Sequence, residues 1–344
     1  MKNSDVMIPR SEPLVHAISW QAQLSNSITS VAHLLKITGN NIEEARQRSS
    51  SDLDFTVRVP HSFVERIVPG DLSDPLLQQV LPLKVETAQT PGYLTDPLAE
   101  SSANVQPGII HKYHGRVLLI LTGACAINCR YCFRRHFPYA ENQNSTLQWH
   151  QALDYIRNDP SITEVIYSGG DPLVNSDKKL SNLTRQIAQI AHVKRLRIHT
   201  RLPIVIPERV TDELLDWLSN SRLHLSIVLH TNHANELDTS VAHAIEKLRQ
   251  SRITLLNQSV LLKGINDTVP ALAQLSEKLF EMGVLPYYLH LLDKVQGAAH
   301  FDISPDTAKT LVGKLTALLP GYLVPKLVFE EPGKASKTLL TPIN

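Results

Sequence analysis

Residues 116–132 read RVLLILTGACAINCRYC, an apolar strand-like run followed at once by all three cysteines of the chain. Cys125, Cys129 and Cys132 form a C-x₃-C-x₂-C cluster. An odd number of thiols so close together makes a poor disulfide framework, and no secretory signal accompanies them. The cluster therefore predicts a metal site or redox centre in a reducing compartment.

The cysteine count restricts the metal. Thiolates suit iron–sulfur clusters or zinc. A four-iron cluster normally takes four cysteines, so three leave one iron free for a ligand that is not protein. A Cys₃His zinc site with His136 as fourth ligand is the alternative. The thiols follow a strand-like run and do not sit between paired ribbons, which favours iron–sulfur over zinc.

Composition excludes several classes of protein. The 344 residues are 42% hydrophobic with a net charge of +1, enough for one large core or two modest ones. Near-neutrality gives no electrostatic reason to expect a nucleic acid partner. No apolar run approaches the roughly 18 residues of a membrane span, and residues 1–10 lack the order of a signal peptide. We expect a soluble cytoplasmic enzyme.

The chain is organised in three parts. Residues 1–87 predict an N-terminal helical cap, with helices near Gln21–Leu35 and Ser62–Val68. Residues 88–114 contain several prolines and glycines with little periodicity, so they predict a long connecting loop that lines a site. Residues 115–344 form the third part.

In this third part, strand-like runs alternate with stretches that can hold a helix, which predicts an α/β fold with parallel strands and right-handed crossovers. Six units are too few for a closed barrel of eight units and about 250 residues. The strand-like runs are 116–122, 163–168, 194–200, 223–230, 254–262 and 285–292. Helical spacing of apolar residues appears in Leu147–Arg157, Asp212–Leu218, Ser240–Leu248 and Ala271–Phe280.

Polar groups follow most of these strands. In parallel α/β folds such groups gather at the carboxyl ends of the strands, so they should converge on one rim. They are the cysteine loop, Ser168–Asp171, His199–Arg201, His230 and Asp293. Gly169 and Gly170 allow the backbone to approach a ligand closely, although a tight strand-to-helix turn explains them equally well.

The cysteine segment CAINCRYC resembles the C-x₃-C-x-aromatic-C pattern of the radical S-adenosylmethionine (SAM) superfamily. CRYCFRRHF is similar to the lysine 2,3-aminomutase family. That resemblance continues through residues 96–117, SGGDPL, NQSVLLKGIND, PYYLHLLD and PGYLVPKLVFEEPGKASK. The resemblance covers roughly residue 90 to the end, and a weaker similarity extends into the N-terminal part. It is strongest to the short bacterial members of the family that make β-lysine for elongation factor P.

The resemblance implies an open, partial (β/α)₆ radical SAM barrel, a 4Fe-4S cluster, SAM and pyridoxal 5′-phosphate (PLP). The cysteines would hold the cluster, and SAM would lie against Ser168, Gly169, Gly170, Asp171, His230 and Gln258. The proline-glycine-spacer-lysine pattern selects Lys337 over Lys334 as the lysine that carries PLP. Lys112, Tyr113 and Arg116 would complete the PLP site, with Arg116 on the phosphate.

For the substrate, the resemblance assigns Arg134 to an amino acid carboxylate, and Asp293 and Glu330 to the side-chain ammonium of lysine. Two buried acids are costly without a cation between them, which favours a cationic substrate. A helix cap for Asp293 and a solvated strand end for Glu330 are the structural alternatives.

We therefore predict a lysine 2,3-aminomutase that converts L-lysine to β-lysine, R by resemblance, for attachment to elongation factor P by a separate ligase. A flavodoxin or ferredoxin would donate the electron that reduces the cluster. A homo-oligomer is a further possibility that the sequence does not decide. The alternatives are a family member acting on another amino acid, an iron–sulfur electron-transfer or sensing protein, and a noncatalytic partner of the translation machinery. The near-neutral charge disfavours the last.

Overall fold

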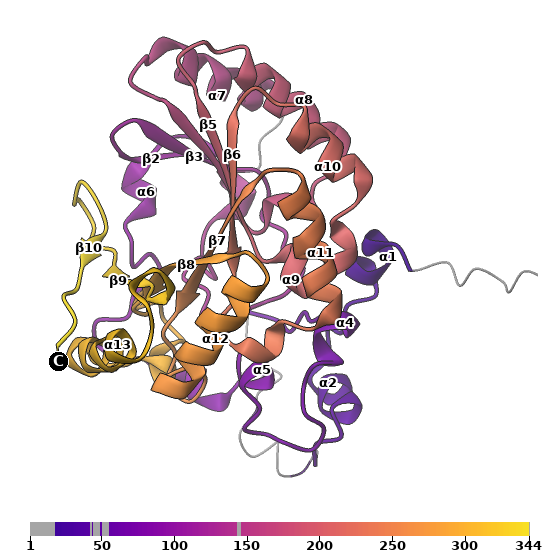
Figure 1. Ribbon diagram of the computed structural model, residues 1–344, viewed down its shortest axis with the longest axis vertical. Helices are drawn as coiled ribbons and strands as arrows, with labels where there is room; N and C mark the ends of the chain where they lie inside the picture. The colour runs from indigo at the N-terminus through magenta and orange to yellow at the C-terminus, as the bar shows by residue number, and fades with distance from the viewer. Residues whose placement is uncertain (1–17, 42, 44–48, 50–54, 143–145, 344) are drawn as a thin grey trace, which may run out of the picture.

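A computed structural model describes residues 18–41, 43, 49, 55–142 and 146–343. Its centre is a ten-stranded sheet whose strands follow chain order, from β1 (Asn104–Gln106) to β10 (Thr338–Leu339). Neighbouring strands from β3 to β9 are parallel, whereas β1, β2 and β10 are antiparallel additions at the edges. The edge strands β1 and β10 do not pair among the described residues, so the curved sheet is an open, partial barrel (Figure 1).

All six strand-like runs are confirmed as parallel strands, with ends within two residues of those expected. The structure adds a seventh, β9 (Lys326–Phe329), which pairs with the preceding strand. Its four residues are too few to show periodicity in the sequence. The six expected strands are β3 (Arg116–Ile120), β4 (Glu164–Ser168), β5 (Arg195–Thr200), β6 (His224–His230), β7 (Thr254–Val260) and β8 (Leu285–His290).

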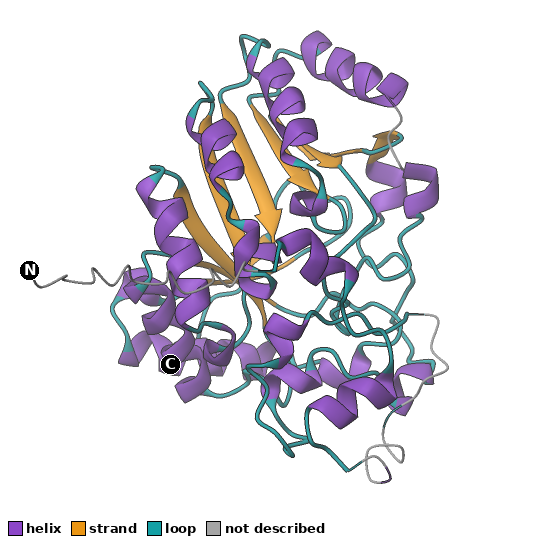
Figure 2. Cartoon of the chain, turned by 90° about the vertical axis from the view of Figure 1, so that its right-hand side faces the viewer, coloured by secondary structure: helices purple, strands orange, loops and turns teal. Residues whose placement is uncertain are grey.

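Helices cover the outer face of the sheet (Figures 1 and 2). Apolar residues at helical spacing, such as Leu180, Leu183 and Ile187, are buried against the strands. The four expected helices are confirmed as α7 (Thr146–Asn158), α10 (Asp212–Ser219), α11 (Thr239–Gln250) and α12 (Val269–Glu281). The structure adds α8 (Asp177–Ala188) and α13 (Pro305–Leu318), and short helices η3 (Pro172–Val174), α9 (Leu202–Val205), η4 (Pro207–Arg209), η5 (Ala234–Glu236), η6 (Ala299–Phe301) and η7 (Gly321–Leu323).

The described part of the N-terminal segment is helical, but its helices are shorter than expected. Two shorter helices replace the single helix expected at 21–35. The chain between them is extended at Ile28, which pairs with Val59 in an isolated β-bridge. The helix expected at 62–68 ends after one turn. The segment's apolar side chains join the same buried cluster as those of the barrel strands. Its helices are α1 (Trp20–Ser25), α2 (Val31–Ile37), α4 (His61–Val64), α5 (Pro75–Gln78) and η1 (Lys84–Thr87).

The prediction of a loop over 88–114 was wrong for its second half. Residues 100–113 form α6 (Glu100–Ala103), β1 and β2 (Ile109–Tyr113), and β2 pairs antiparallel with β3. Only two residues of β2, Ile109 and Ile110, are buried. So short an apolar run shows no periodicity, and the strand is stabilised by its pairing partner.

A buried ion pair ties the cysteine loop to the N-terminal segment. The Arg130 guanidinium is fully buried and donates from Nε and Nη2 to the Glu86 carboxylate at 2.9 and 2.5 Å. Nη1 donates to the carbonyl of Phe55 at 2.7 Å, and Arg135 donates to the same carboxylate. Because Arg130 lies between two of the cysteines, this pair fixes the loop's position.

Replacing Glu86→Gln should lower the free energy of unfolding by about 3 kcal/mol, because it leaves a buried guanidinium without its counter-charge. Urea unfolding followed by circular dichroism measures the change. The matched control is Asp154→Asn, which breaks the exposed pair with Arg157 and should cost less than about 0.5 kcal/mol. Equal losses in the two variants would contradict the structural role of Glu86.

Candidate active site

One cavity of about 840 Å³ lies inside the partial barrel and reaches the loops at the carboxyl ends of its strands. Every predicted site residue lines it, so the expected convergence is confirmed, while the individual roles stay predictions. These residues are Lys112, Tyr113, Arg116, Cys125, Cys129, Cys132, Arg134, Ser168, Gly169, Gly170, Asp171, His230, Gln258, Asp293, Glu330 and Lys337.

The cysteine loop is held against the glycine turn that follows β4. The amide of Gly170 donates to the carbonyl of Thr122 at 2.7 Å, and that of Asp171 to Ala124 at 2.9 Å. A Cβ at Gly169 would lie 2.4 Å from the Thr122 oxygen, and Gly169 has a φ of 123°. A Cβ at Gly170 would lie 2.3 Å from the Ala124 oxygen. Both glycines are therefore required by backbone-to-backbone packing.

The three thiols line the same cavity and lie close enough to interact electrostatically with one another. Burial, followed by the neighbouring Cys129, raises the pKa of the Cys132 thiol to about 11. Burial and the Cys132 sulfur raise the pKa of Cys125 well above its ordinary value. A cluster of close, mutually repelling sulfurs favours a cationic occupant that replaces their protons.

The geometry gives little support to a zinc site. His136 is exposed, is not among the cavity's lining residues, and its Nε2 lies 3.3 Å from the carbonyl of Gln296. In the described part of the chain, no three Cys, His, Asp or Glu side chains converge tightly enough for a single ion. Zinc needs ligands at roughly 2.0 to 2.3 Å around one centre. A larger cluster accommodates more widely spaced sulfurs.

Asp171 is engaged within the protein. Its carboxylate accepts hydrogen bonds from the Thr200 hydroxyl and from the amides of Leu173, Arg201 and Leu202. Burial raises its pKa although these donors act in the opposite direction. Asp171 thus joins the loops after β4 and β5.

His230 and Gln258 are paired across the neighbouring strands β6 and β7, and His230 is the last residue of its strand. The His230 ring stacks on Tyr131 with centroids 5.7 Å apart, and its Nε2 lies 3.2 Å from the Tyr131 hydroxyl. Burial, aided by the positive charge of Arg201, lowers the pKa of His230 to about 3. Its imidazole is therefore neutral at physiological pH.

Arg134 has a partner that sequence reasoning missed. Its Nε and Nη2 donate to the two oxygens of Glu100 at 2.7 and 2.8 Å. Nη1 donates to the Ser168 hydroxyl at 3.0 Å. Glu100 lies in a segment that was expected to be a loop, and no spacing marked it. The pair fixes the guanidinium at the cavity wall with Nη1 beside the glycine turn.

Lys337 enters the cavity from the segment between β9 and β10, where its ammonium contacts the Glu330 carboxylate. The Tyr113 hydroxyl donates to Glu330 at 2.9 Å, and the Lys112 ammonium lies 3.5 Å away. Burial alone would raise the pKa of Glu330, but Lys337 and Lys112 outweigh it and hold the value at about 2. In this structure Glu330 therefore binds an internal ammonium group.

The pKa of Asp293, the second acidic residue, is raised, whereas that of Glu330 is lowered. Burial and the charge of Glu330 raise the pKa of Asp293 to about 7, against which Lys337 is a smaller effect. Asp293 is thus about half protonated at neutral pH in the protein alone. A ligand cation placed beside it would stabilise the carboxylate form.

Several buried polar atoms of the cavity have no hydrogen-bond partner within the described protein. They are Nε2 of His199 and His290 and Nε of Arg135, Arg197 and Arg201. Burial lowers the pKa of both histidines well below its ordinary value, with the charge of Lys337 contributing. Unpartnered buried groups are costly, so the cavity fits a polar occupant that supplies partners for them.

Comparison with known proteins identifies the family. Residues 119–275 match the model of the radical SAM superfamily. The chain is 51% identical over 323 residues to the L-lysine 2,3-aminomutase of Escherichia coli strain K12, covering 93% of this chain and 94% of that protein. It is 48% identical to the Haemophilus influenzae protein of the same name, over 97% and 98% of the two chains. The chain belongs to the lysine 2,3-aminomutase family.

This lysine 2,3-aminomutase family member is accordingly an isomerase of the radical SAM superfamily, with a 4Fe-4S cluster and SAM as cofactors. Among solved structures, a radical SAM methyltransferase from Sphaerobacter thermophilus is 16% identical, with a TM-score of 0.45 over 64% of this chain and 68% of that one. Three cysteine thiols lining one cavity fit a 4Fe-4S cluster in which the fourth iron has no protein ligand and is free to bind SAM.

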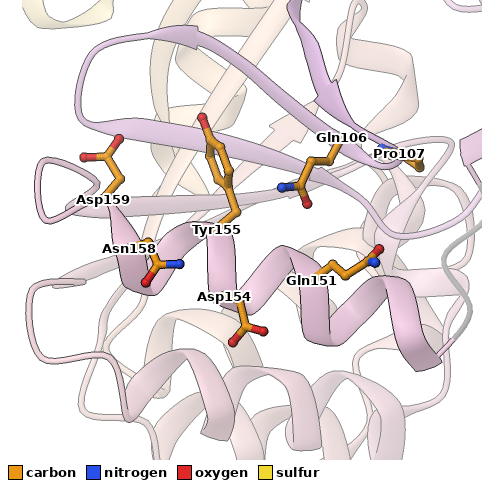
Figure 3. Close-up of a pocket in the computed structure, with 7 residues that line it drawn as sticks. All are labelled: Gln106, Pro107, Gln151, Asp154, Tyr155, Asn158 and Asp159. Carbon is orange, nitrogen blue, oxygen red and sulfur yellow. The ribbon is translucent and has the colours of Figure 1, made fainter.

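A second pocket shares no lining residue with this cavity. This pocket of about 540 Å³ lies between α7 and the turn after β1 (Figure 3), lined by Gln106, Pro107, Gln151, Asp154, Tyr155, Asn158 and Asp159. None of the described helices is both long enough and apolar enough to cross a lipid bilayer.

Changing any one of Cys125, Cys129 or Cys132 to Ser should leave little or no iron bound after anaerobic reconstitution, because each thiolate is predicted to hold one corner of the cluster. Iron and sulfide analysis with electron paramagnetic resonance (EPR) measures the loss. His136→Ala should retain the full cluster. Loss of metal from His136→Ala would instead favour the Cys₃His zinc site.

Asp293 should make the ligand-free protein less stable as pH rises. The folded state keeps this proton up to about pH 7, whereas an unfolded aspartate loses it near pH 4. The free energy of unfolding of the wild type, relative to Asp293→Asn, should therefore fall by roughly 2 kcal/mol between pH 5 and 8. Urea unfolding at several pH values measures this, and a pH-independent difference would show that Asp293 does not titrate in this range.

Proposed function

We propose that this enzyme moves the α-amino group of L-lysine to Cβ and so produces β-lysine. The proposal is supported by the name L-lysine 2,3-aminomutase carried by relatives that align over more than nine-tenths of the chain. The observation that carries it furthest is the close group of Lys337, Glu330 and Asp293 in the same cavity as the cysteines.

We infer that PLP binds at Lys337. When bound, this cofactor supplies an electron sink that stabilises an unpaired electron beside the migrating nitrogen. In this proposal Lys337 carries the cofactor. Glu330 pairs with the Lys337 ammonium when no cofactor is attached to that lysine. Arg116 and Lys112 offer cations for the phosphate, and the guanidinium of Arg116 lies 4.7 Å from the centre of the Tyr113 ring.

The same cavity offers complementary groups for lysine. Arg134 is fixed by Glu100, and in this proposal its Nη1 exchanges its present acceptors, the Ser168 hydroxyl and the Gly169 carbonyl, for the substrate carboxylate. Asp293 offers its carboxylate to the side-chain ammonium, and that cation would lower its raised pKa. In this proposal Glu330 turns from Lys337 to the substrate ammonium once Lys337 has engaged the cofactor. SAM would lie between the cysteines and the wall formed by Ser168, Gly169, Gly170, His230 and Gln258, with Asp171 anchoring that wall.

We further propose that the product is (R)-β-lysine and that a separate ligase attaches it to elongation factor P. The support is the sequence similarity to short bacterial family members described above. A flavodoxin or ferredoxin in the cytoplasm would reduce the cluster. The proposal requires no nucleic acid or membrane partner, and a homo-oligomer is compatible with it.

Anaerobically reconstituted enzyme with PLP, SAM and a reductant should convert L-lysine to β-lysine, measured by chromatography. Lys337→Ala should abolish both product and the absorbance of protein-bound PLP, because the nitrogen that carries the cofactor is lost. The matched control is Lys334→Ala, three residues earlier and fully outside the cavity lining, which should retain both.

Three results would redirect the assignment. Wild type loaded with cluster and PLP that yields no β-lysine would reject lysine as substrate. Turnover of another amino acid that is unaffected by Asp293→Asn would favour the alternative family specificity. A loaded cluster that never cleaves SAM would favour an electron-transfer or sensing role.

A further inference from the structure

Arg201, which the sequence places at the rim without a role, reaches the cysteine loop from the end of β5. Its Nη1 donates to the Cys129 sulfur at 2.7 Å and to the Tyr131 hydroxyl at 2.6 Å. The residue is buried. One nitrogen of the guanidinium is thus shared between a cluster ligand and the aromatic residue of the same loop.

The other side of the guanidinium is held by buried groups. Nη2 donates to Glu236 Oε2 at 2.8 Å and to Gln79 Oε1 at 2.7 Å, and both acceptor residues are fully buried. The second oxygen of Glu236 accepts the backbone amides of Asn232 and His233. Arg201 is therefore fixed by groups from two segments outside the cysteine loop, one around Gln79 and the other at residues 232–236.

The arginine remains charged in this setting. A guanidinium keeps its proton inside proteins, and its counter-charge here is the Glu236 carboxylate at 2.8 Å. A fixed positive charge and a hydrogen bond at a sulfur both stabilise the more negative, reduced form of an iron–sulfur cluster. The Glu236 carboxylate opposes this effect from the far side of the guanidinium.

We propose that Arg201 is a positioning residue that sets the reduction potential of the cluster through its hydrogen bond to Cys129. Glu236 and Gln79 aim it at the sulfur. Removing the arginine makes the reduced cluster less stable and so moves the midpoint potential to a more negative value. The proposal depends on the cluster and not on which amino acid the enzyme rearranges.

The test is a redox titration of the cluster, followed by EPR, in anaerobically reconstituted protein without SAM, PLP or lysine. Arg201→Met should shift the midpoint potential to a more negative value at unchanged iron content. Arg201→Lys should shift it less, because the charge remains but one ammonium cannot reach both the sulfur and Glu236. Glu236→Gln should shift it in the opposite direction, since a negative charge is removed.

The matched control is Arg209→Lys, at another buried arginine whose guanidinium binds Asp177 and the carbonyl of Leu173. It should leave the potential unchanged. If Arg201→Met does not retain its cluster, Arg201→Lys decides the question by the same titration. A potential equal to that of the wild type in a loaded Arg201 variant overturns the proposal, as does an equal shift in Arg209→Lys.

Discussion

The close approach of two backbones, the cysteine loop after β3 and the glycine turn after β4, is the constraint on which the rest of the site depends. It leaves no space for a Cβ at Gly169 or Gly170. The contact holds the cysteine loop in the lining of the cavity and brings Asp171 into reach of the next loop. Once these loops are locked together, the position of the cluster relative to the barrel interior is fixed.

The second organising feature is the balance of buried charge along the cavity. Arg134 is paired with Glu100, Lys337 with Glu330, and Arg201 with Glu236, so most charges are neutralised inside the protein. Asp293 has no ion-pair partner among the described residues, and burial together with the charge of Glu330 raises its pKa. Buried pairs of this kind cost desolvation energy, and what they provide here is fixed orientation. An enzyme that generates a radical needs its groups fixed before the reaction begins.

The limits of sequence reasoning are visible at particular residues. The strands and their polar ends could be predicted, because buried parallel strands are apolar runs and their order fixes which ends meet. Glu100, Glu86 and the role of Arg201 could not. Each forms its decisive contact with a residue at least 34 positions away in the chain. No local pattern encodes such a partner. The strand β2 was missed for a different reason, because it pairs with the adjacent strand β3 but buries only Ile109 and Ile110, too short a run to show periodicity.

Family resemblance indicated Lys337, Asp293 and Glu330, whereas the sequence by itself predicted a metal or redox centre and a close backbone approach, from three clustered cysteines and a glycine turn after a strand. Residue type and spacing suffice for this, because ligand softness and backbone freedom are local properties. Only the tertiary structure decided which charges neutralise one another and which remain available to a ligand. That outcome depends on distances and burial, and both are set by how the chain folds on itself rather than by any segment of it.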